Sequence, residues 1–458
     1  MEFVGREQEL ERLERWWSTS ERFALVWGRR RVGKTALVHR FAGGKRTIFH
    51  TGGGESPRQE LAGLSRRTAE AFPSDLRDLA AHPYYDWHDA LDHLARLARD
   101  EPVLLVLDEF PELLIGYPAL PGVLRAFWDR AQGETMLRVL LCGSSVRTMF
   151  SIQETRAPLY GRFDLALPVH PFRPHEAAAM LRDLRPSDRA AVYGLVGGMP
   201  LYLSWWDQHR GVGENLLELA CRPGARLLSE GRLVLATEVG EGEQPAAVLR
   251  AIASGRTKFH EISDAVGANP ARALDRLIEL RLVERVLPVT ETERSRRRIY
   301  RICDNFLSFY LGPLMRYRAE IELDMGESIV GALLARIDDH MGAAYEEAFR
   351  DHLRRLATRG SLGPRVVAIG PWWRGDGGDQ IDAVVMAEPK RTRIPTLVGE
   401  AKWATTVNAS RLRARLYEKA GSLTERRDEL TYAVCARETV AHGDPDVLAI
   451  TAAEIFAE

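Results

Sequence analysis

Apolar and polar positions are grouped along the first third of the chain in a way that predicts strands followed by helices. Residues 23–27 and 103–107 are uninterrupted apolar runs, and residues 138–145 contain a third. Runs of this length are typical of strands buried on both faces of a parallel sheet. An apolar-periodic, helix-like segment begins at Ala36, shortly after the first run. This part of the chain is therefore predicted to be an α/β domain.

The pattern changes between residues 245 and 302, where three short helices and a hairpin with a charged tip are expected. This order of elements is that of a winged helix-turn-helix. Farther along, a predicted helix at 342–356 is followed by two predicted strands, at 380–387 and 395–403. A helix, a strand with an aspartate and a strand with an ExK triplet form the skeleton of the restriction-endonuclease-like fold.

The composition is that of a globular protein with several domains. Of the 458 residues, 45% are hydrophobic and 28% charged, and the formal net charge of −1 excludes a globally basic nucleic-acid binder. A chain of this length exceeds one ordinary core. We expect four domains: an α/β core at 1–170, a helical lid at 171–242, a winged helix-turn-helix at 243–315 and a nuclease-like α/β domain at 316–458.

Cysteine spacing and hydropathy indicate the compartment. The four cysteines lie scores of residues apart, so neither a zinc site nor a disulfide framework is expected. No apolar run approaches the roughly 20 residues that a membrane helix needs, and the first ten residues are charged where a signal peptide would be apolar. We expect a cytoplasmic protein with no membrane segment.

Residues 28–35 match the pattern GxxxxGK[ST] between a predicted strand and a predicted helix. This is a P-loop, in which backbone N–H groups turn toward phosphate oxygens at a helix N-terminus. Lys34 is expected to reach the β- and γ-phosphates of ATP, and Thr35 to hold Mg²⁺. The predicted nucleotide contacts are Gly28, Arg29, Arg30, Arg31, Val32, Gly33, Lys34, Thr35 and Ala36. The alternative is an arginine-rich surface turn.

Hydrolysis also requires carboxylates, which we expect at the end of a neighbouring strand. The second apolar run ends in Asp108 and Glu109. Asp108 is predicted to bind Mg²⁺ through water, and Glu109 to polarise the attacking water. The third strand, expected between the first two, ends in Ser144 and Ser145. Ser144 is the candidate γ-phosphate sensor, with Ser145 as the alternative and a plain serine turn as a third possibility.

Six segments in this order resemble the archaeal-type ATPase family within the AAA+/STAND group of P-loop proteins: FVGREQELERL, the P-loop, LVLDEF, LLCGSS, PLYGR and GGMPLYL. The resemblance implies that Val4, Gly5 and Arg6 lie against the adenine. It also implies that Arg162 is an arginine finger, commonly supplied to a neighbouring subunit, so a homo-oligomer is expected. Pro200 is implied as a nucleotide contact, and a helix-start proline is the alternative.

The predicted winged helix-turn-helix allows two interpretations. Its tip carries four arginines, Arg294, Arg296, Arg297 and Arg298, which suit phosphate contacts. The exposed face of its third helix is of mixed sign, however, with Arg272, Asp275, Arg276 and Glu279. Binding of DNA or RNA through the wing, mostly to the backbone, and simple packing between domains both remain open.

The C-terminal segment carries candidate residues for phosphodiester cleavage. This chemistry needs carboxylates that hold Mg²⁺ and a lysine that activates water or stabilises charge. We assign Asp382, Glu400 and Lys402 to these roles, with Glu346 as an accessory metal ligand. A second ExK triplet, at 388–390, is rejected because Pro389 and a basic run place it in a turn. The resemblance supports the assignment, since many archaeal-type ATPases carry a C-terminal domain that looks like this fold, although no PD dipeptide is present.

Basic and aromatic residues flank these candidates on both sides. Trp372, Trp373 and Arg374 precede them, and a predicted helix with Arg411, Arg413, Arg415 and Lys419 follows. Stacking and phosphate contact are one interpretation, and a tryptophan pair in the core beside a solvated helix face is the other.

Together these features predict an ATPase whose nucleotide state controls a winged helix and a nuclease-like module that acts on nucleic acid. The alternative is a nucleotide-dependent switch or scaffold in which the C-terminal domain only binds. A third possibility is an ATPase that regulates a protein partner.

Overall fold

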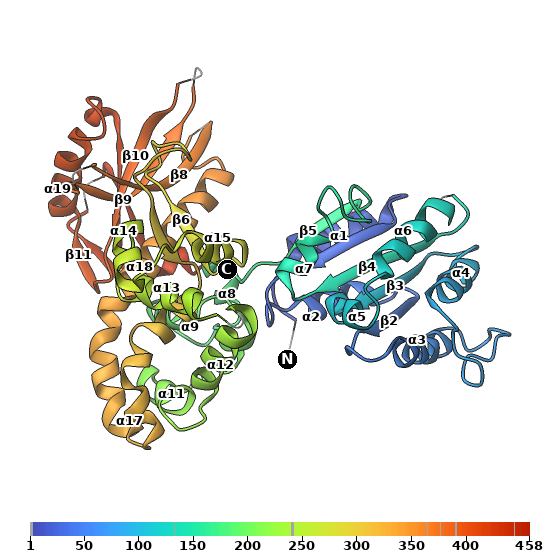
Figure 1. The fold of residues 1–458 in the computed structure, drawn as a ribbon. Helices are drawn as coiled ribbons and strands as arrows, with labels where there is room; N and C mark the ends of the chain where they lie inside the picture. The colour runs from blue at the N-terminus through green and yellow to red at the C-terminus, as the bar shows by residue number, and fades with distance from the viewer. Residues whose placement is uncertain are drawn as a thin grey trace. The chain divides into compact units, whose positions relative to one another are not determined.

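The computed structural model of the chain forms two compact units, Met1–His170 and Pro171–Glu458 (Figure 1). The residues that the structure describes are 3–131, 133–239, 242–363, 365–375, 377–389, 392–443 and 445–458. Each unit is built around its own sheet of five strands.

The sheet of the first unit is entirely parallel. It consists of β1 (Phe23–Trp27), β2 (Thr47–Thr51), β3 (Val103–Asp108), β4 (Leu137–Gly143) and β5 (Leu165–Pro168), in the order β2-β3-β4-β1-β5. Every residue of β1 and β3 is buried, as their uninterrupted apolar runs predict. Since the strands are parallel, the residues that follow β1, β3 and β4 meet at one edge of the sheet.

Helices cover this sheet. They are α1 (Glu7–Ser18), α2 (Lys34–Ala42), α3 (Pro57–Ala71), α4 (Trp87–Leu97), α5 (Phe110–Gly116), α6 (Leu120–Ala131) and α7 (Val146–Ser151). Alternate residues of β1, β3 and β4 share one core with α3 to α7. Helices α1 and α2 pack on each other through Trp16 and Phe41, whose ring centroids are 6.1 Å apart.

The second unit begins with helices. They are α8 (Pro174–Ala178), α9 (Pro186–Val196), α10 (Pro200–Ser204), α11 (Val212–Leu219) and α12 (Arg226–Val234). Three further helices follow, α13 (Glu243–Ala253), α14 (Phe259–Val266) and α15 (Ala271–Glu279), and then the antiparallel pair β6 (Val283–Val286) and β7 (Ile299–Ile302). Helix α13 contacts α14, α15 and β7, so these elements share one small core.

A second sheet, of mixed direction, occupies the C-terminal part. It consists of β8 (Val366–Trp373), β9 (Gln380–Ala387), β10 (Ile394–Ala401), β12 (Thr431–Ala436) and β14 (Val447–Thr451), in the order β14-β12-β10-β9-β8. Strands β8 and β10 are each antiparallel to β9, which lies between them, whereas β10, β12 and β14 are parallel. A short parallel pair, β11 (Thr406–Asn408) and β13 (Thr439–Ala441), lies beside it.

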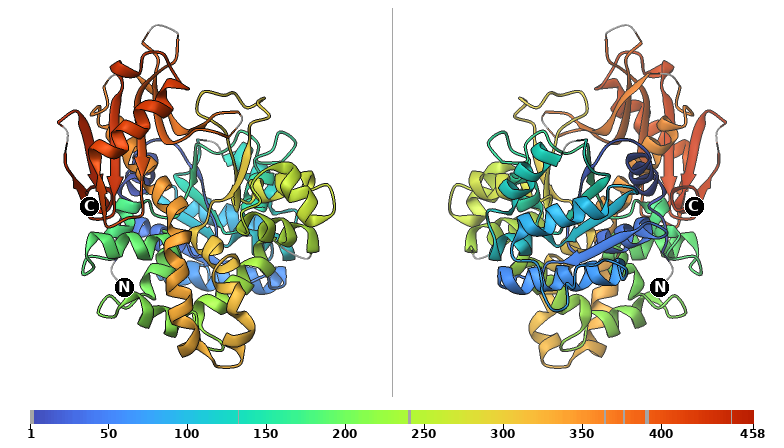
Figure 2. Two further views of the ribbon diagram at one scale, coloured as in Figure 1. Left: turned by 90° about the vertical axis from the view of Figure 1, so that its left-hand side faces the viewer. Right: turned by 90° about the vertical axis from the view of Figure 1, so that its right-hand side faces the viewer.

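Helices cover both faces of the second sheet. After α16 (Asn305–Leu311) and α17 (Arg318–Glu322), the long helix α18 (Gly326–Thr358) runs from α11 to the sheet (Figure 2). Phe349 and Leu353 of α18 pack on one face, together with α20 (Ala452–Ile455). Leu412 and Leu416 of α19 (Ala409–Gly421) pack with the opposite set of strand residues.

The β6–β7 hairpin packs against this sheet within the second unit. The backbone N–H of Val289, in the hairpin connection, donates to the carbonyl oxygen of Pro371 on β8 at 2.8 Å. A Cβ atom at Gly370 would lie 3.3 Å from the Cβ of Val289, so the two segments are in close contact. Among the described residues, no helix combines the length and the apolar character needed to span a bilayer.

Candidate nucleotide site and candidate carboxylate site

The loop between β1 and α2 has the backbone of a phosphate-binding turn. A Cβ atom at Gly28 would lie 2.3 Å from the carbonyl oxygen of Val169, so only glycine fits there. Arg31 and Gly33 have φ angles of 69° and 92°, in the left-handed region. This conformation lets successive N–H groups face one point, which is the geometry of an anion-binding nest.

Arg6 supports this loop from the segment that precedes α1. Its guanidinium is buried, with 3% of the residue exposed, and Nη2 donates to the carbonyl oxygen of Val32 at 2.9 Å. Nη1 pairs with Glu9 at 2.9 Å. Val4 and Gly5 lie immediately before it, and Gly5 and Arg6 both have positive φ. The structure thus places the predicted adenine-side segment against the P-loop.

Lys34 and Thr35 begin α2 and point to different partners. The Lys34 ammonium is buried, and Nζ donates to the carbonyl oxygen of Arg29 at 3.0 Å. The Thr35 hydroxyl donates to Oδ2 of Asp108 at 3.0 Å. Ala36 follows in the first turn of α2, and Arg30 pairs with Glu112 at 3.7 Å.

Asp108 is the most deeply buried acid of this site, with 1% exposed. Its second oxygen, Oδ1, makes no hydrogen bond to any residue that the structure describes. A buried carboxylate oxygen without a partner is costly, and together with the Thr35 hydroxyl it offers the hard oxygen ligands that Mg²⁺ prefers. These two residues therefore fit the metal that the P-loop implies.

The strand that carries Asp108 is not directly paired with β1. β4 lies between them and pairs with both, which is the position expected for the third strand. The same order places the end of β4, where Ser144 follows, between the P-loop strand and the acidic strand.

Ser144 and Ser145 have different partners. The Ser144 hydroxyl donates to Oε2 of Glu109 at 2.7 Å, and its N–H approaches the same oxygen at 3.3 Å. The Ser145 side chain caps α7 by accepting from the N–H of Thr148 at 3.4 Å. Ser144 thus faces the acid that we expect to polarise water, whereas Ser145 serves the helix.

Arg162 and Pro200, the two residues implied only by the family resemblance, have local roles. Arg162 forms a two-pronged ion pair with Asp129 of α6. Pro200 is the first residue of α10, which is the helix-start alternative for this proline. It belongs to the second unit, and Arg162 to the first.

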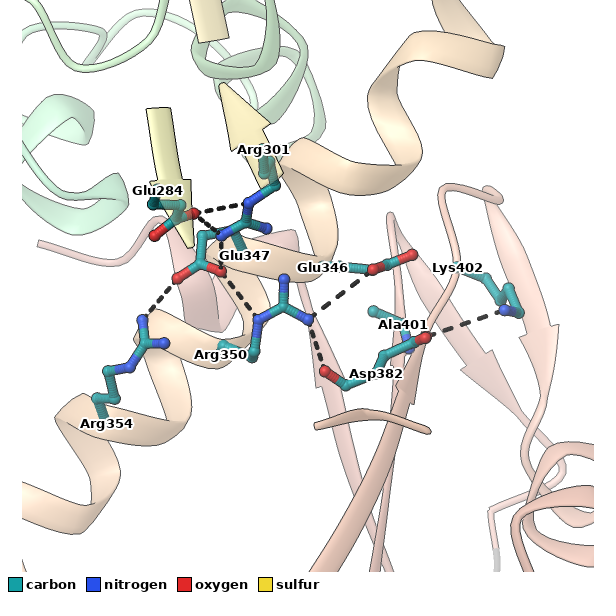
Figure 3. A network of polar contacts seen from close by, with 9 residues as sticks. All are labelled: Glu284, Arg301, Glu346, Glu347, Arg350, Arg354, Asp382, Ala401 and Lys402. Atoms are coloured by element: carbon teal, nitrogen blue, oxygen red, sulfur yellow. Dashed lines mark hydrogen bonds and ion pairs between the residues drawn. The ribbon is translucent and has the colours of Figure 1, made fainter. Parts of the chain in front are cut away.

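The C-terminal candidates come together at the second sheet, from three elements. Asp382 lies on β9, Lys402 follows the end of β10, and Glu346 lies on α18 (Figure 3). Glu400 lies at the end of β10. Lys402 Nζ is 2.8 Å from Glu400 and 3.9 Å from Asp382. Asp382 Oδ2 also accepts from the N–H of Ala401 at 3.0 Å. Asp382 and Glu400 are buried, whereas 43% of the Lys402 side chain is exposed.

Burial and mutual repulsion perturb the acids of this site. Burial, and then the charge of Asp382, raises the pKa of Glu346 to about 7. Burial also raises the pKa of Asp382, and Glu400 adds to the effect. For Glu400, burial acts upward, but hydrogen bonds from Lys402 and Lys419 outweigh it and lower its pKa. Acids forced together in this way favour a bound cation or proton.

Two basic residues of the site were not predicted as part of it. Lys419 of α19 donates to Oε2 of Glu400 at 2.7 Å, so each oxygen of Glu400 faces an ammonium. Arg350 of α18 is buried, with 2% exposed, and donates to the carbonyl oxygen of Asp382 at 2.6 Å. It also lies 3.8 Å from Glu346, one turn earlier (Figure 3). The only sequence signal for Arg350 was its position four residues after an acid, Glu346.

A network of ion pairs links this site to the hairpin. Glu347 accepts from Arg301 on β7 at 2.7 Å, from Arg350 at 2.9 Å and from Arg354 at 2.7 Å (Figure 3). Burial acts to raise the pKa of Glu347, but the three guanidinium charges outweigh it and lower the pKa. Arg301 also pairs with Glu284 on β6.

The ligand set for a metal is smaller here than predicted. Among the described residues, no group of three or more His, Cys, Asp or Glu side chains is arranged to hold an ion. Glu346 and Asp382 repel each other across a short gap, so they are the better pair for a cation, whereas Glu400 is paired with two lysines. Of the rejected ExK triplet, Glu388 follows the end of β9 and Lys390 lies outside the described residues.

Comparisons with known proteins show what the two parts of the chain resemble. Residues 3–205 match the family described as an ATPase domain predominantly from Archaea, and residues 310–414 match one described as Archaea bacterial proteins of unknown function. An uncharacterized protein of Methanocaldococcus jannaschii is 25% identical over 411 residues, which are 88% of this chain and 87% of that protein. An uncharacterized ATP-binding protein of the same organism is 47% identical over 45 residues, which are 10% of this chain and 76% of that protein.

Among solved structures, the Walker-type ATPase of Pyrococcus abyssi has a related fold. Its TM-score is 0.53 at 21% identity, over 68% of this chain and 96% of that chain. The chain therefore contains a P-loop ATPase fold. Residues 3–205 match the predominantly archaeal ATPase family, and residues 310–414 match the second family.

Proposed function

We propose that this protein binds and hydrolyses ATP and that its nucleotide state controls a C-terminal module that cleaves nucleic acid. The observation that carries the first part is the Thr35–Asp108 contact beside an unpartnered Asp108 oxygen at the end of a P-loop. The observation that carries the second part is the cluster of Glu346, on the helix α18, with Asp382, Glu400 and Lys402 at one end of the strands β9 and β10.

In the ATP site, the protein supplies position and charge. The P-loop amides and Lys34 would bind the phosphates, and Val4, Gly5 and Arg6 would border the adenine. Thr35 and Asp108 would hold Mg²⁺, which when bound neutralises charge on the phosphate oxygens. Glu109 would polarise the attacking water, and Ser144 would keep Glu109 in place through its 2.7 Å hydrogen bond.

Assembly is the second element of the proposal. Arg162 would act as an arginine finger on a nucleotide held by another copy of the chain. Asp129 holds its guanidinium in the isolated chain, and assembly would exchange this partner for a phosphate. Pro200 would be a nucleotide contact only if the helical lid closes on the ATP site.

We divide the chain into a P-loop core at 1–170, a helical lid at 171–242, a winged helix-turn-helix at 243–315 and a restriction-endonuclease-like domain at 316–458. The α13–α15 helices and the β6–β7 hairpin support the third assignment. The helix α18, the strands β9 and β10 and the parallel strands beyond them support the fourth.

In the carboxylate site, Glu346 and Asp382 would hold Mg²⁺ beside a phosphodiester, with Glu400 as a third ligand once its lysines turn to the substrate. The metal supplies charge neutralisation and a more acidic water. Lys402, which is half exposed, would activate water or stabilise the developing charge. Arg350 would position Asp382 through its hydrogen bond to the main-chain carbonyl oxygen, and Glu346 through their ion pair.

A second candidate function is a nucleotide-dependent switch whose C-terminal domain binds but does not cut. One observation favours it: both oxygens of Glu400 are occupied by ammonium groups from Lys402 and Lys419. A carboxylate neutralised in this way is a poor metal ligand until the lysines leave.

Cleavage of labelled DNA and RNA in Mg²⁺, with ATP, with ADP and without nucleotide, separates the two candidates. We expect nucleotide-dependent cleavage that Glu400→Gln abolishes. Glu388→Gln is the matched control, because Glu388 belongs to the other ExK triplet, at the end of β9. The absence of cleavage under every metal and nucleotide condition would remove the nuclease proposal and leave the switch.

A further inference from the structure

A cavity of about 690 Å³ lies between the β6–β7 hairpin, the helices α14 and α15, and the end of β8. We call it the hairpin cavity. Its basic lining residues are Lys258, Arg285, Arg296, Arg297, Arg298 and Arg374. The only acid among its described lining residues is Asp275, which pairs with Arg285 at 3.3 Å. Three more of these cations pair with acids outside the lining: Lys258 with Glu261, Arg297 with Glu291 and Arg374 with Asp379. The positive charge of the cavity that is not offset by an ion pair among the described residues therefore comes from Arg296 and Arg298.

Arg297 presents unused donors to this cavity. Its Nη1 pairs with Glu291 at 2.7 Å, but Nε and Nη2 are buried and have no hydrogen-bond partner among the described residues. Nε lies 4.0 Å from the position of a Cβ on Gly375, at the other wall. Buried guanidinium N–H groups without acceptors are costly, and phosphate oxygens would satisfy two at once.

Arg298 and Arg296 are further candidates for phosphate contact. In the part of the chain that the structure describes, neither has an ion-pair partner within 4.0 Å, although both line the cavity. Three consecutive arginines thus point their charge at one space. Guanidinium groups are the preferred partners of phosphate, because their donors match two oxygens at a time.

Two aromatic side chains lie among these charges. Phe259, at the start of α14, is 40% exposed, and Trp373, at the end of β8, is half-buried. Both line the hairpin cavity. Trp372, its neighbour, is buried in the core of the sheet instead. Aromatic faces next to a basic groove are the usual platform for unpaired bases, because every base has a face that can stack.

The third helix of the predicted winged helix-turn-helix is poorly suited to a duplex. Asp275 and Glu279 are exposed on α15. In a major groove these carboxylates would be close to phosphates, and the repulsion would oppose binding. Of these two acids only Asp275 lines the hairpin cavity, where Arg285 pairs with it, so a single strand there would not meet Glu279.

The hairpin cavity leads toward the carboxylate site. It shares Lys258, Ile299, Tyr300, Trp373 and Gly377 with a second cavity of about 670 Å³, which we call the junction cavity. The junction cavity is lined by Glu346 and Arg350, two members of the carboxylate site. A strand held in the first cavity could therefore continue to the second.

We propose that the hairpin cavity binds single-stranded nucleic acid, with phosphates on Arg297 and Arg298 and a base on Phe259 or Trp373, and delivers the strand to Glu346. The inference rests on the proposed action on nucleic acid and specifies its substrate as a single-stranded region, such as an end or a flap, in place of an intact duplex.

The test is binding of a fluorescein-labelled 20-nucleotide single strand, as DNA and as RNA, to the full chain in EDTA, followed by fluorescence anisotropy. We expect the single strand to bind at least about tenfold more tightly than a duplex of the same sequence. Arg298→Ala should weaken strand binding about tenfold and reduce the slope of log K against log salt by about 0.7, the value for one phosphate contact on a single strand. Phe259→Ala should weaken it several-fold with no change in that slope.

Arg256→Ala is the matched control, because Arg256 is exposed in the same domain and lines neither cavity. Arg298 has no ion pair with any residue that the structure describes, so its variant removes a cation without breaking a contact of the fold. Equal or tighter binding of duplex, or an effect of Arg256→Ala as large as that of Arg298→Ala, would overturn the proposal. The binding assay contains EDTA, so strand binding is measured independently of cleavage. Strand binding in EDTA together with no cleavage in a separate Mg²⁺ assay would count against the nuclease alone.

Discussion

The two candidate sites of this chain differ in how their carboxylates are paired. At the P-loop, Asp108 keeps one buried oxygen without a partner, and a nest of left-handed backbone faces one point. At the second sheet, Glu400 faces two lysines, Glu347 faces three arginines, and Arg350 lies between two acids. The first site is prepared for a ligand, whereas the second is held by its own counterions. We infer that the first site can bind its ligand without rearrangement, whereas the second can bind a metal only after the lysines on Glu400 move.

The largest effect is expected at the P-loop. Lys34→Ala removes the ammonium that would reach the transferred phosphate, and ATP turnover should fall by a factor of about 10² to 10³. Arg40→Ala, which removes an exposed cation from the same helix, should leave turnover within about twofold. Steady-state phosphate release measures both. Equal losses in the two variants would mean that only the net charge of α2 matters.

The second site should respond mainly in stability. Arg350→Met removes the buried partner of Glu346 and one of the three arginine partners of Glu347, and should lower the free energy of unfolding by about 3–5 kcal/mol. Arg354→Met removes a half-exposed partner of the same Glu347 and should cost less than about 1 kcal/mol. Urea unfolding followed by tryptophan fluorescence compares them. Equal shifts would show that the network is not buried in solution.

The serine pair separates catalysis from helix capping. Ser144→Ala frees Glu109 and should lower ATP turnover about tenfold or more, since partners that orient a reacting group commonly contribute this much. Ser145→Ala should leave turnover unchanged and lower the free energy of unfolding by about 0.5–2 kcal/mol, the usual value of an N-cap. The opposite pattern would assign the sensor role to Ser145.

The smallest effect is a pH dependence of the second unit. Burial lowers the pKa of His340 and of His352 to about 4 each, below the ordinary value of 6.5. The unfolded chain therefore binds more protons between these values, and the free energy of unfolding should fall as the pH drops from 6.5 to 4, by on the order of 1 kcal/mol per unit. His352→Gln should flatten this slope, and His209→Gln, an exposed site, should not. Unfolding midpoints between pH 7 and 4.5 provide the measurement.

The sequence predicts a site best when the site is local. The P-loop is eight consecutive residues whose spacing has one structural solution, and the apolar runs before it and before Asp108 are buried strands. The apolar pattern within each strand does not contain the position of β4 between those strands. That position is expected instead from the serines that follow β4, where a γ-phosphate sensor would lie.

Partners that meet only through the fold were missed. Arg350 reaches Asp382 across 32 residues, and Lys419 reaches Glu400 across 19. Nothing near either residue in sequence distinguishes it from a basic residue on a solvated helix face. The same holds for Trp372 and Trp373: alternation along β8 places Trp372 in the core and Trp373 at a cavity, so the core interpretation is confirmed for Trp372 alone and stacking by Trp373 stays a prediction.

The central claim is that Thr35 and Asp108 hold the Mg²⁺ of a hydrolysed ATP. A Mg²⁺ titration of ATP turnover, comparing the natural chain with Asp108→Asn, tests it most directly. We predict Mg²⁺-dependent turnover in the natural chain and a loss of at least about a hundredfold in the variant, with ATP binding retained. Unchanged turnover and an unchanged Mg²⁺ half-saturation in Asp108→Asn would contradict the claim.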